Sequence, residues 1–259
     1  MIKLKNYSIE MKHFVLFITF LIFISCSTNQ YNVSKIEGRK IEINQELPII
    51  AEFETFIKPY RDHINKDLDS VLAFAPETLD KSKGQWQTNI GNFMADVCFE
   101  KASILFEKRH QKKIDICLLN HGGIRSIIPK GSITSRTAFE VMPFENSINV
   151  IALKGAQIEE MATYLISEKK PHPVSGLKIN INASNEIISI LVNDKTVNKS
   201  QTYYVATSDY LSNGGDNMTF FQKNEGVFDL DYKIRNVLID HFKEVDTLKV
   251  STEKRIIIN

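Results

Sequence analysis

The amino-acid sequence predicts a single mixed α/β (α+β) domain, in which one mixed sheet is flanked by helices. Segments with the three- and four-residue apolar spacing of helices are interleaved with short apolar or alternating segments that are typical of strands. Neither a regular strand–helix–strand period nor an internal repeat is present. The composition is that of a globular protein, with 43% hydrophobic and 24% charged residues in a chain of 259.

Net charge and cysteine content exclude some classes of function. The formal net charge is +1, whereas nucleic-acid-binding proteins usually have a strongly basic face, so we expect no nucleic-acid partner. Cys26, Cys98 and Cys117 lack the spacing of a metal site. Cys98 and Cys117 lie in apolar segments and are predicted to be core residues, with a disulfide between them as the alternative.

Residues 1–26 are predicted to be a signal peptide. Segment 11–25 has a short basic start and about a dozen apolar residues, too few to span a bilayer comfortably. The segment ends at Cys26, where the sequence CSTNQ resembles the lipobox of bacterial lipoproteins. This resemblance implies lipidation of Cys26 and an exported protein anchored to the bacterial cell envelope, at the outer membrane or the periplasmic face. The alternatives are a simple signal peptide and an uncleaved anchor.

Residues 27–48 are polar and are predicted to form a tether, and the domain is predicted to extend over residues 49–259. Segment 53–72 has its apolar residues on one helical face. The proline-containing segment 73–87 ends this pattern, and a second helix begins at Thr88 or Asn89, which are both favourable N-cap residues.

The remaining elements alternate between strands and helices. Further helices are predicted over residues 135–141, 155–166 and 232–245, and strands over 114–119, 147–153, 177–182, 187–192, 203–207 and 255–258. The strands on either side of Asn185 are predicted to form a hairpin.

Three turns at the ends of apolar strands contain the candidate binding residues. The first, 120–125, has the sequence NHGGIR. Its consecutive residues Gly122 and Gly123 allow backbone N–H groups to approach an anion closely, and Arg125 can bind a phosphate or a carboxylate through two nitrogens. The Asn120 amide can both donate and accept hydrogen bonds. The alternative is a tight turn with a surface arginine.

The second and third turns each contain an aromatic residue. Phe144 lies in the PFEN turn 143–146, and Tyr210 lies six residues before Asp216 of the NGGD turn 213–216. Two aromatic rings can sandwich a nucleobase, and a carboxylate can accept hydrogen bonds from ribose hydroxyls. Taken alone, Phe144 is also consistent with a core residue, and Asp216 with a turn-forming aspartate.

Three segments resemble the C-terminal domain of the 5′-nucleotidase / UDP-sugar hydrolase family. They have the sequences NIGNFMADV, LLNHGGIRSIIPKGSITSRTAFEVMPFENSINVIALKGAQI and YYVATSDYLSNGGDNMTFF, and they lie between Asn89 and Phe221. The resemblance implies a substrate-binding domain of that fold, with a nucleotide or nucleoside as ligand. The implied substrate-binding residues are Asn120, Gly122, Gly123 and Arg125 for base and phosphate, Phe144 and Tyr210 for the two faces of the base, Asn146 for the pocket lining, and Asp216 with Gly214 and Gly215 for the ribose.

The chain departs from the family pattern at three positions. His121 and Tyr210 stand where the family usually has Gly and Phe, and the arginine that family members commonly have before the Asn89 helix is absent. Lys81 or Lys83 can replace that arginine as a point charge, although neither can bind a phosphate in bidentate fashion.

The metal-binding motifs of the family's N-terminal domain, DxH, GDxxD and GNH, are absent from this sequence. The six histidines are scattered and are predicted to be surface residues, so we assign no catalytic residue, metal ligand or cofactor to this chain. We expect a chain that is inactive alone, the substrate-recognition half of a 5′-nucleotidase-type phosphohydrolase of nucleotide catabolism. Divalent metals are then expected only in a separate metallophosphatase partner chain. The alternatives are a non-catalytic nucleotide- or nucleoside-binding surface lipoprotein and a scaffold with a decayed pocket.

Overall fold

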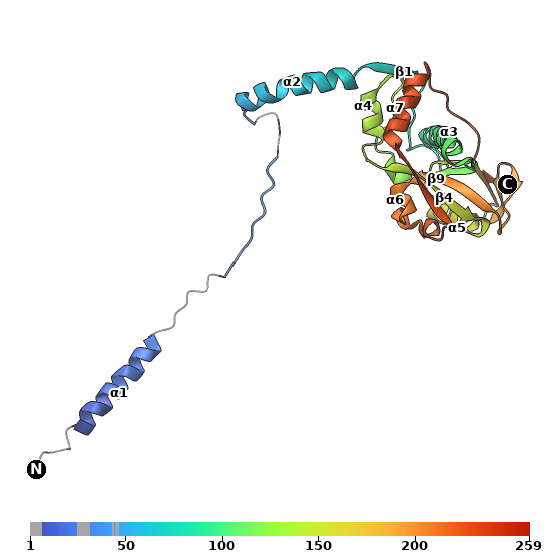
Figure 1. Ribbon diagram of the computed structural model, residues 1–259. Helices are drawn as coiled ribbons and strands as arrows, with labels where there is room; N and C mark the ends of the chain where they lie inside the picture. Colours follow the sequence, from blue (N-terminus) through green and yellow to red (C-terminus); the bar gives the residue numbers. More distant parts are fainter. Residues whose placement is uncertain (1–6, 25–31, 43, 45–46) are drawn as a thin grey trace, which may run out of the picture. The chain divides into compact units, whose positions relative to one another are not determined.

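The computed structural model describes residues 7–24, 32–42, 44 and 47–259. The described residues divide into two units, one up to Ala51 and one from Glu52 to Asn259. Helix α1 of the first unit spans Tyr7–Ile24 (Figure 1). None of the helices in the described ranges combines the length and the apolarity that a membrane crossing requires. Cys26 lies outside the described residues, so the signal peptide, the lipidation and the tether stay predictions.

Helix α2 (Ala51–Leu68) has the predicted apolar stripe, but the stripe faces solvent. Phe53, Phe56 and Tyr60 are exposed, and no residue of the helix is buried. The predicted extension of this helix to residue 72 is wrong, because the chain bends after Leu68 and continues as strand β1 (Val71–Ala75). β1 pairs with β3 (Gly131–Thr134), a segment in which no strand was predicted.

A five-stranded mixed sheet forms the centre of the second unit, with the strand order β10-β4-β9-β2-β5. The strands are β2 (Ile116–Leu118), β4 (Ser147–Lys154), β5 (Val174–Ser175), β9 (Thr202–Ser208) and β10 (Gly226–Lys233). β2 is parallel to β9, whereas β4 is antiparallel to both β9 and β10, and β5 is antiparallel to β2.

Both faces of this sheet are covered at its centre, which explains why β2 is apolar throughout and why most residues of β4 and β9 are buried, whereas the edge strand β10 alternates between buried or half-buried and exposed residues. Ile116 and Leu118 pack into the core on one face, and Cys117 and Leu119 pack into the core on the other. Helices α3 (Asn89–His110), α4 (Ser135–Val141) and α7 (Ile234–Glu244) contribute to the second of these cores, and α5 (Gly155–Glu168) to the first (Figure 1). The single mixed α/β domain is therefore confirmed.

A smaller sheet, with the order β11-β6-β7-β8, packs with α5 in the same core. Its strands are β6 (Leu177–Ile181), β7 (Ile187–Val192), β8 (Lys195–Thr196) and β11 (Ile256–Ile258). β6 and β7 form the predicted hairpin, and Asn185 between them adopts a left-handed conformation with φ 62°.

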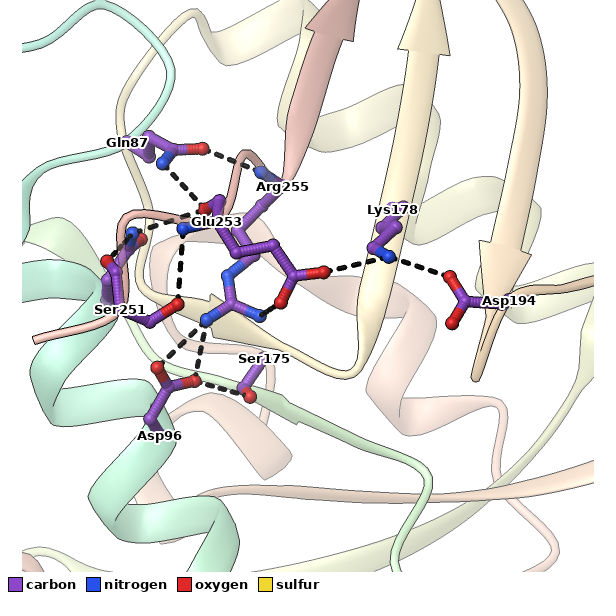
Figure 2. Close-up of polar contacts among 9 residues, drawn as sticks. Gln87, Asp96, Ser175, Lys178, Asp194, Ser251, Glu253 and Arg255 are labelled. Carbon is purple, nitrogen blue, oxygen red and sulfur yellow. Dashed lines mark hydrogen bonds and ion pairs between the residues drawn. The ribbon is translucent and has the colours of Figure 1, made fainter.

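A polar network fixes the C-terminal segment to the domain (Figure 2). The buried Arg255 places Nη2 2.8 Å from both carboxylate oxygens of Asp96 in α3, and the Ser175 hydroxyl donates to Asp96 at 2.6 Å. The Glu253 carboxylate forms ion pairs with Arg255 Nη1, at 3.2 Å, and with Lys178 Nζ, at 2.8 Å. The network therefore connects α3, β5 and β6 to the start of β11.

Local signals predicted several element boundaries correctly. The Thr88 hydroxyl accepts a hydrogen bond from Gly91 N–H and caps α3, and α4 occupies the predicted residues. The helix predicted over 232–245 starts later, at Ile234, because its first residues belong to strand β10, which was not predicted.

Cys98 and Cys117 are confirmed as core residues and are free thiols, and burial raises the pKa of Cys98 to about 12.

Candidate functional site

The sheet topology places the three candidate turns at one edge of the central sheet. β2 and β9 are parallel neighbours that end at this edge, and β4, antiparallel to β9, begins there. The Thr207 hydroxyl near the end of β9 donates to the Leu118 carbonyl at the end of β2, at 2.8 Å. The turns that follow β2 and β9 and the turn that precedes β4 are therefore adjacent.

The first and third turns are joined by a direct hydrogen bond, in which Asn120 Nδ2 donates to Asp216 Oδ2 at 2.8 Å. A Cβ at Gly122 would lie 3.6 Å from Asn120 Nδ2 and 4.0 Å from the same carboxylate oxygen, which are ordinary contact distances, so this glycine lies directly beside the hydrogen-bonded pair. At Gly123 a Cβ would lie only 2.7 Å from Asn120 Oδ1. The absence of a side chain at Gly123 therefore allows the Asn120 amide to fold over the turn.

The third turn holds Asp216 in place through several contacts. Tyr210 Oη donates to Asp216 Oδ1 at 2.9 Å and accepts from Asp216 N–H at 3.2 Å, while Tyr164 Oη donates to the Asp216 carbonyl at 2.7 Å. Asp216 and Asn217 have φ values of 51° and 59°, in the left-handed region that is costly for residues other than glycine. The surrounding structure thus imposes a strained backbone at this carboxylate.

The two glycines of the third turn have different roles. A Cβ at Gly215 would lie 2.5–2.7 Å from three carbons of the Tyr210 ring, so the ring rests against this glycine. Gly214 adopts φ 87° and faces Gln222 instead, so its contribution is to the turn conformation and not to the lining of the site.

A second hydrogen bond joins the turns that contain the aromatic residues. Asn146 Nδ2 donates to Asp209 Oδ1 at 2.7 Å, and Tyr210 N–H donates to the same oxygen at 2.7 Å. Phe144 and Tyr210 are 43% and 47% exposed, so the core alternative for Phe144 is wrong. Hydrogen bonds to Asp209 therefore join the two turns, and both aromatic residues remain about half exposed to solvent.

Two cations lie next to the first turn, and one of them is also close to the Phe144 ring. Arg125 Cζ is 6.0 Å from the centroid of the Phe144 ring, and Lys81 Nζ donates to the Ile124 carbonyl at 2.5 Å. Burial, and then repulsion from the adjacent Arg125, lower the pKa of Lys81. In the part of the chain that the structure describes, neither cation forms a salt bridge. Because Arg125 affects the pKa of Lys81, Lys81 lies beside Arg125, and it is one of the two lysines considered as replacements for the family arginine.

A buried histidine lies beneath the first turn. His172 is 4% exposed, and its Nδ1 accepts a hydrogen bond from the His121 backbone N–H at 3.3 Å. Burial lowers the pKa of His172 to about 4, against the opposing effect of Asp216. The prediction that every histidine lies on the surface is wrong for His172, because this side chain packs against the Tyr164 ring, with centroids 5.9 Å apart.

The structure thus assembles nine of the ten predicted binding residues around one edge of the sheet, with Gly214 directed elsewhere. It adds Lys81, Tyr164, Asp209 and His172, of which only Lys81 had a signal in the sequence. Two half-exposed rings, an oriented carboxylate and two cations are suited to a ligand with a flat ring, hydroxyl groups and an anionic group. Among the described residues, no cluster of three or more His, Cys, Asp or Glu side chains is arranged to hold a metal ion.

Comparisons with known proteins identify the family and the fold of the chain. The model of the family described as 5′-nucleotidase, C-terminal domain, matches residues 71–223. An apyrase of Tabanus yao is 21% identical over 246 residues, covering 87% of this chain and 44% of the apyrase. The trifunctional nucleotide phosphoesterase protein YfkN of Bacillus subtilis is 30% identical over 173 residues, covering 61% of this chain and 11% of that protein.

Among solved structures, the crystal structure of a 5′-nucleotidase precursor from Thermus thermophilus is similar to this chain with a TM-score of 0.66 and 24% identity. The match covers 80% of this chain and 42% of that protein, and it shows a common fold. The chain spans less than half of the length of each of these three proteins.

Proposed function

The chain belongs to the 5′-nucleotidase C-terminal domain family, and from this premise we propose that it is the nucleotide-recognition part of a 5′-nucleotidase-type phosphohydrolase of nucleotide catabolism. The observation that supports the proposal best is the linkage of the three turns. Asn120 contacts Asp216, and Asn146 contacts Asp209, so the turns next to three neighbouring strands are joined to one another.

The base of the nucleotide stacks between Phe144 and Tyr210, whose half-exposed rings lie on the two linked turns. The Asn146 amide nitrogen is engaged by Asp209, which leaves its carbonyl oxygen to accept from a donor on the base edge. Asp216 accepts one hydrogen bond on each carboxylate oxygen, and a carboxylate has about four lone-pair positions. Asp216 can therefore accept further hydrogen bonds from ribose hydroxyls.

The phosphate binds to Arg125 and Lys81. These two side chains are adjacent, and within the described ranges they donate hydrogen bonds to backbone carbonyls and not to carboxylates, so their charge is available to an anion. Arg125 can bind two phosphate oxygens through its planar guanidinium, whereas Lys81 acts as a point charge. The nucleotide is thus held by three kinds of group: the two aromatic rings, the Asp216 carboxylate and the two cations.

Bond cleavage is assigned to a second protein. The family resemblance implies a two-metal centre in an N-terminal domain, and the described residues of this chain have no side-chain cluster that fits such ions. We therefore assign no metal-dependent step to this chain. A separate, exported metallophosphatase chain would supply the metal ions, and lipidation of Cys26 would hold the binding chain on the cell envelope.

Calorimetric titration of the purified domain with AMP, adenosine and ribose 5-phosphate tests the binding site. We expect AMP to bind most tightly, because it alone contacts the rings, Asp216 and the cations. Phe144→Ala is expected to weaken AMP and adenosine binding, whereas Phe74→Ala, which removes a phenylalanine of β1 with 45% exposure, is the matched control. A folded wild-type domain that binds none of the three ligands contradicts the proposed function.

A phosphate-release assay tests the assignment to two chains. AMP and divalent metal are incubated with this chain, with a purified exported metallophosphatase chain, and with both. The proposal predicts a higher rate for the mixture than for the sum of the separate chains, and no such gain would contradict it. Tight AMP binding without activity in any mixture would favour the alternative, a non-catalytic nucleotide-binding surface lipoprotein.

Membrane attachment is tested separately. Metabolic labelling with a fatty acid is expected to label the wild-type protein and not Cys26→Ser, and the variant is expected in the soluble fraction. An unlabelled wild-type protein contradicts the lipid anchor without affecting the binding proposal.

A further inference from the structure

We propose that Arg235, at the start of α7, is a positioning residue that holds the Phe144 turn in the geometry required for stacking on the base. The proposal rests on the proposed function, since it concerns how the same site obtains its affinity. Arg235 belongs to none of the motifs that suggested the site.

The support of the turn comes from the strand next to β4. β10 is antiparallel to β4 and ends at Lys233, opposite Ser147, so the start of α7 lies at the same edge of the sheet as the three turns. Three consecutive residues at this junction donate hydrogen bonds to the turn. Lys233 Nζ donates to the Glu145 carbonyl at 2.7 Å, and Ile234 N–H donates to the Asn146 carbonyl at 3.0 Å.

Arg235 makes the contacts on either side of Phe144. Its Nη1 donates to the Pro143 carbonyl at 3.3 Å, and its Nη2 forms an ion pair with the Glu145 carboxylate. The residue before the ring and the residue after it are thus held by one guanidinium. The Phe144 side chain itself is left free to face the ligand, with 43% exposure.

The guanidinium is fixed from its other side. Arg235 is 7% exposed, and its Cζ lies 4.2 Å from the centroid of the Phe139 ring in α4. A planar cation that stacks on an aromatic ring and donates from two nitrogens has little freedom of orientation. Arg235 therefore connects α4, α7 and the Phe144 turn rigidly.

Rigidity of this turn matters because it lies at the surface. Pro143, Phe144 and Glu145 are all exposed, so core packing does not fix the ring. A mobile ring must be ordered when the base binds, and this cost reduces the affinity. Arg235 acts through Phe144 and is assigned no contact with the nucleotide.

The test compares Arg235→Gln with Arg255→Gln, which removes a second buried, ion-paired arginine, located in the network of Figure 2. Both variants are expected to lower stability, as measured by urea unfolding. Only Arg235→Gln is expected to weaken adenosine and AMP binding, by about tenfold, within the range expected when a stacked ring is lost. Ribose 5-phosphate, which has no base, is expected to bind both variants as it binds the wild type.

A second variant keeps the proposal testable if Arg235→Gln does not fold. Glu145 is 70% exposed in its side chain, so Glu145→Gln removes the ion pair with little effect on the fold. It is expected to weaken adenosine binding by about threefold and to leave ribose 5-phosphate binding unchanged. Wild-type adenosine affinity in the folded variants, or equal losses for adenosine and ribose 5-phosphate, overturns the proposal. A wild-type domain that binds no ligand refutes the proposed function instead.

Discussion

Replacing Gly215 with alanine tests whether the position of the Tyr210 ring determines nucleoside affinity. The new Cβ would lie 2.5 Å from Cε1, 2.6 Å from Cζ and 2.7 Å from Cδ1 of Tyr210, closer than real Cβ contacts. The three nearest atoms all belong to this ring and none to the backbone. Because the Tyr210 side chain is 47% exposed, the ring can swing outward and the backbone can stay in place.

The expected cost follows from the contacts that the ring would lose. Tyr210 Oη donates to Asp216 Oδ1 and accepts from Asp216 N–H, and each such hydrogen bond contributes about 0.5–1.5 kcal/mol. Water can replace part of this at an exposed hydroxyl, so we expect the free energy of unfolding to fall by about 1 kcal/mol. For a domain of this size, that corresponds to a decrease of about 2–4 °C in Tm.

The effect on ligand binding is expected to be larger. Stacking on one ring contributes about 1–3 kcal/mol per base, so a displaced Tyr210 should weaken adenosine binding by about tenfold. Calorimetry with adenosine and ribose 5-phosphate separates the loss of the stack from a general loss of the site.

Gly226→Ala is the matched control for this substitution. A Cβ at Gly226, in the edge strand β10, would lie 3.7 Å from the Phe228 ring, which is an ordinary contact. We expect unchanged adenosine binding and unchanged or slightly higher stability, because alanine restricts the unfolded chain. If Gly215→Ala bound adenosine as tightly as the wild type, the reasoning that this glycine sets the ring position would be refuted.

Three further outcomes follow from the site and the core. Lys81→Met is expected to lower AMP affinity about tenfold and to leave adenosine affinity unchanged, because the proposed charge-assisted hydrogen bond to the phosphate is lost. Lys81→Arg should restore AMP affinity, and equal losses for both ligands would contradict the assignment. Burial lowers the pKa of His172 to about 4 in the folded state, against about 6.5 in the unfolded state. The free energy of unfolding, measured with urea, should therefore be highest above pH 6.5 and should fall by up to ~3 kcal/mol towards pH 4. His172→Gln should reduce this dependence on pH. Burial raises the pKa of Cys98 to about 12, so iodoacetamide should modify this thiol only after unfolding, as measured by mass spectrometry, and rapid labelling of the native protein would contradict the buried position.

Local chemistry made part of the fold predictable from the sequence. Thr88 marked the start of α3, and the segment after Thr134 was predicted as a helix with the bounds that α4 has. β1, β3 and β10 were missed because their stability comes from pairing with strands that are distant in sequence. The exposure of the α2 stripe was also not predictable, since periodicity shows that a face is apolar and does not show what covers it.

The site was predictable to the extent that its residues lie in recognisable turns. Asn120, Phe144 and Asp216 were identified from glycines, rings and charges near strand ends. Asp209 and Arg235 were not, because an aspartate after a strand and an arginine within a helix have no distinctive neighbours. Their importance depends on which strands are adjacent, and only the β10-β4-β9-β2 order determines that.

The hydrogen bonds that close the site also determine when it can form during folding. Asn120 and Asp216 are 96 residues apart in the chain, and Asn146 and Asp209 are 63 residues apart. Contacts of such long sequence separation form late, after most of the chain entropy has been lost. A partly folded chain that lacks these hydrogen bonds is therefore expected not to hold the three turns together. Nucleotide that binds only the native state should slow hydrogen exchange throughout β2, β4 and β9, and not only in the turns.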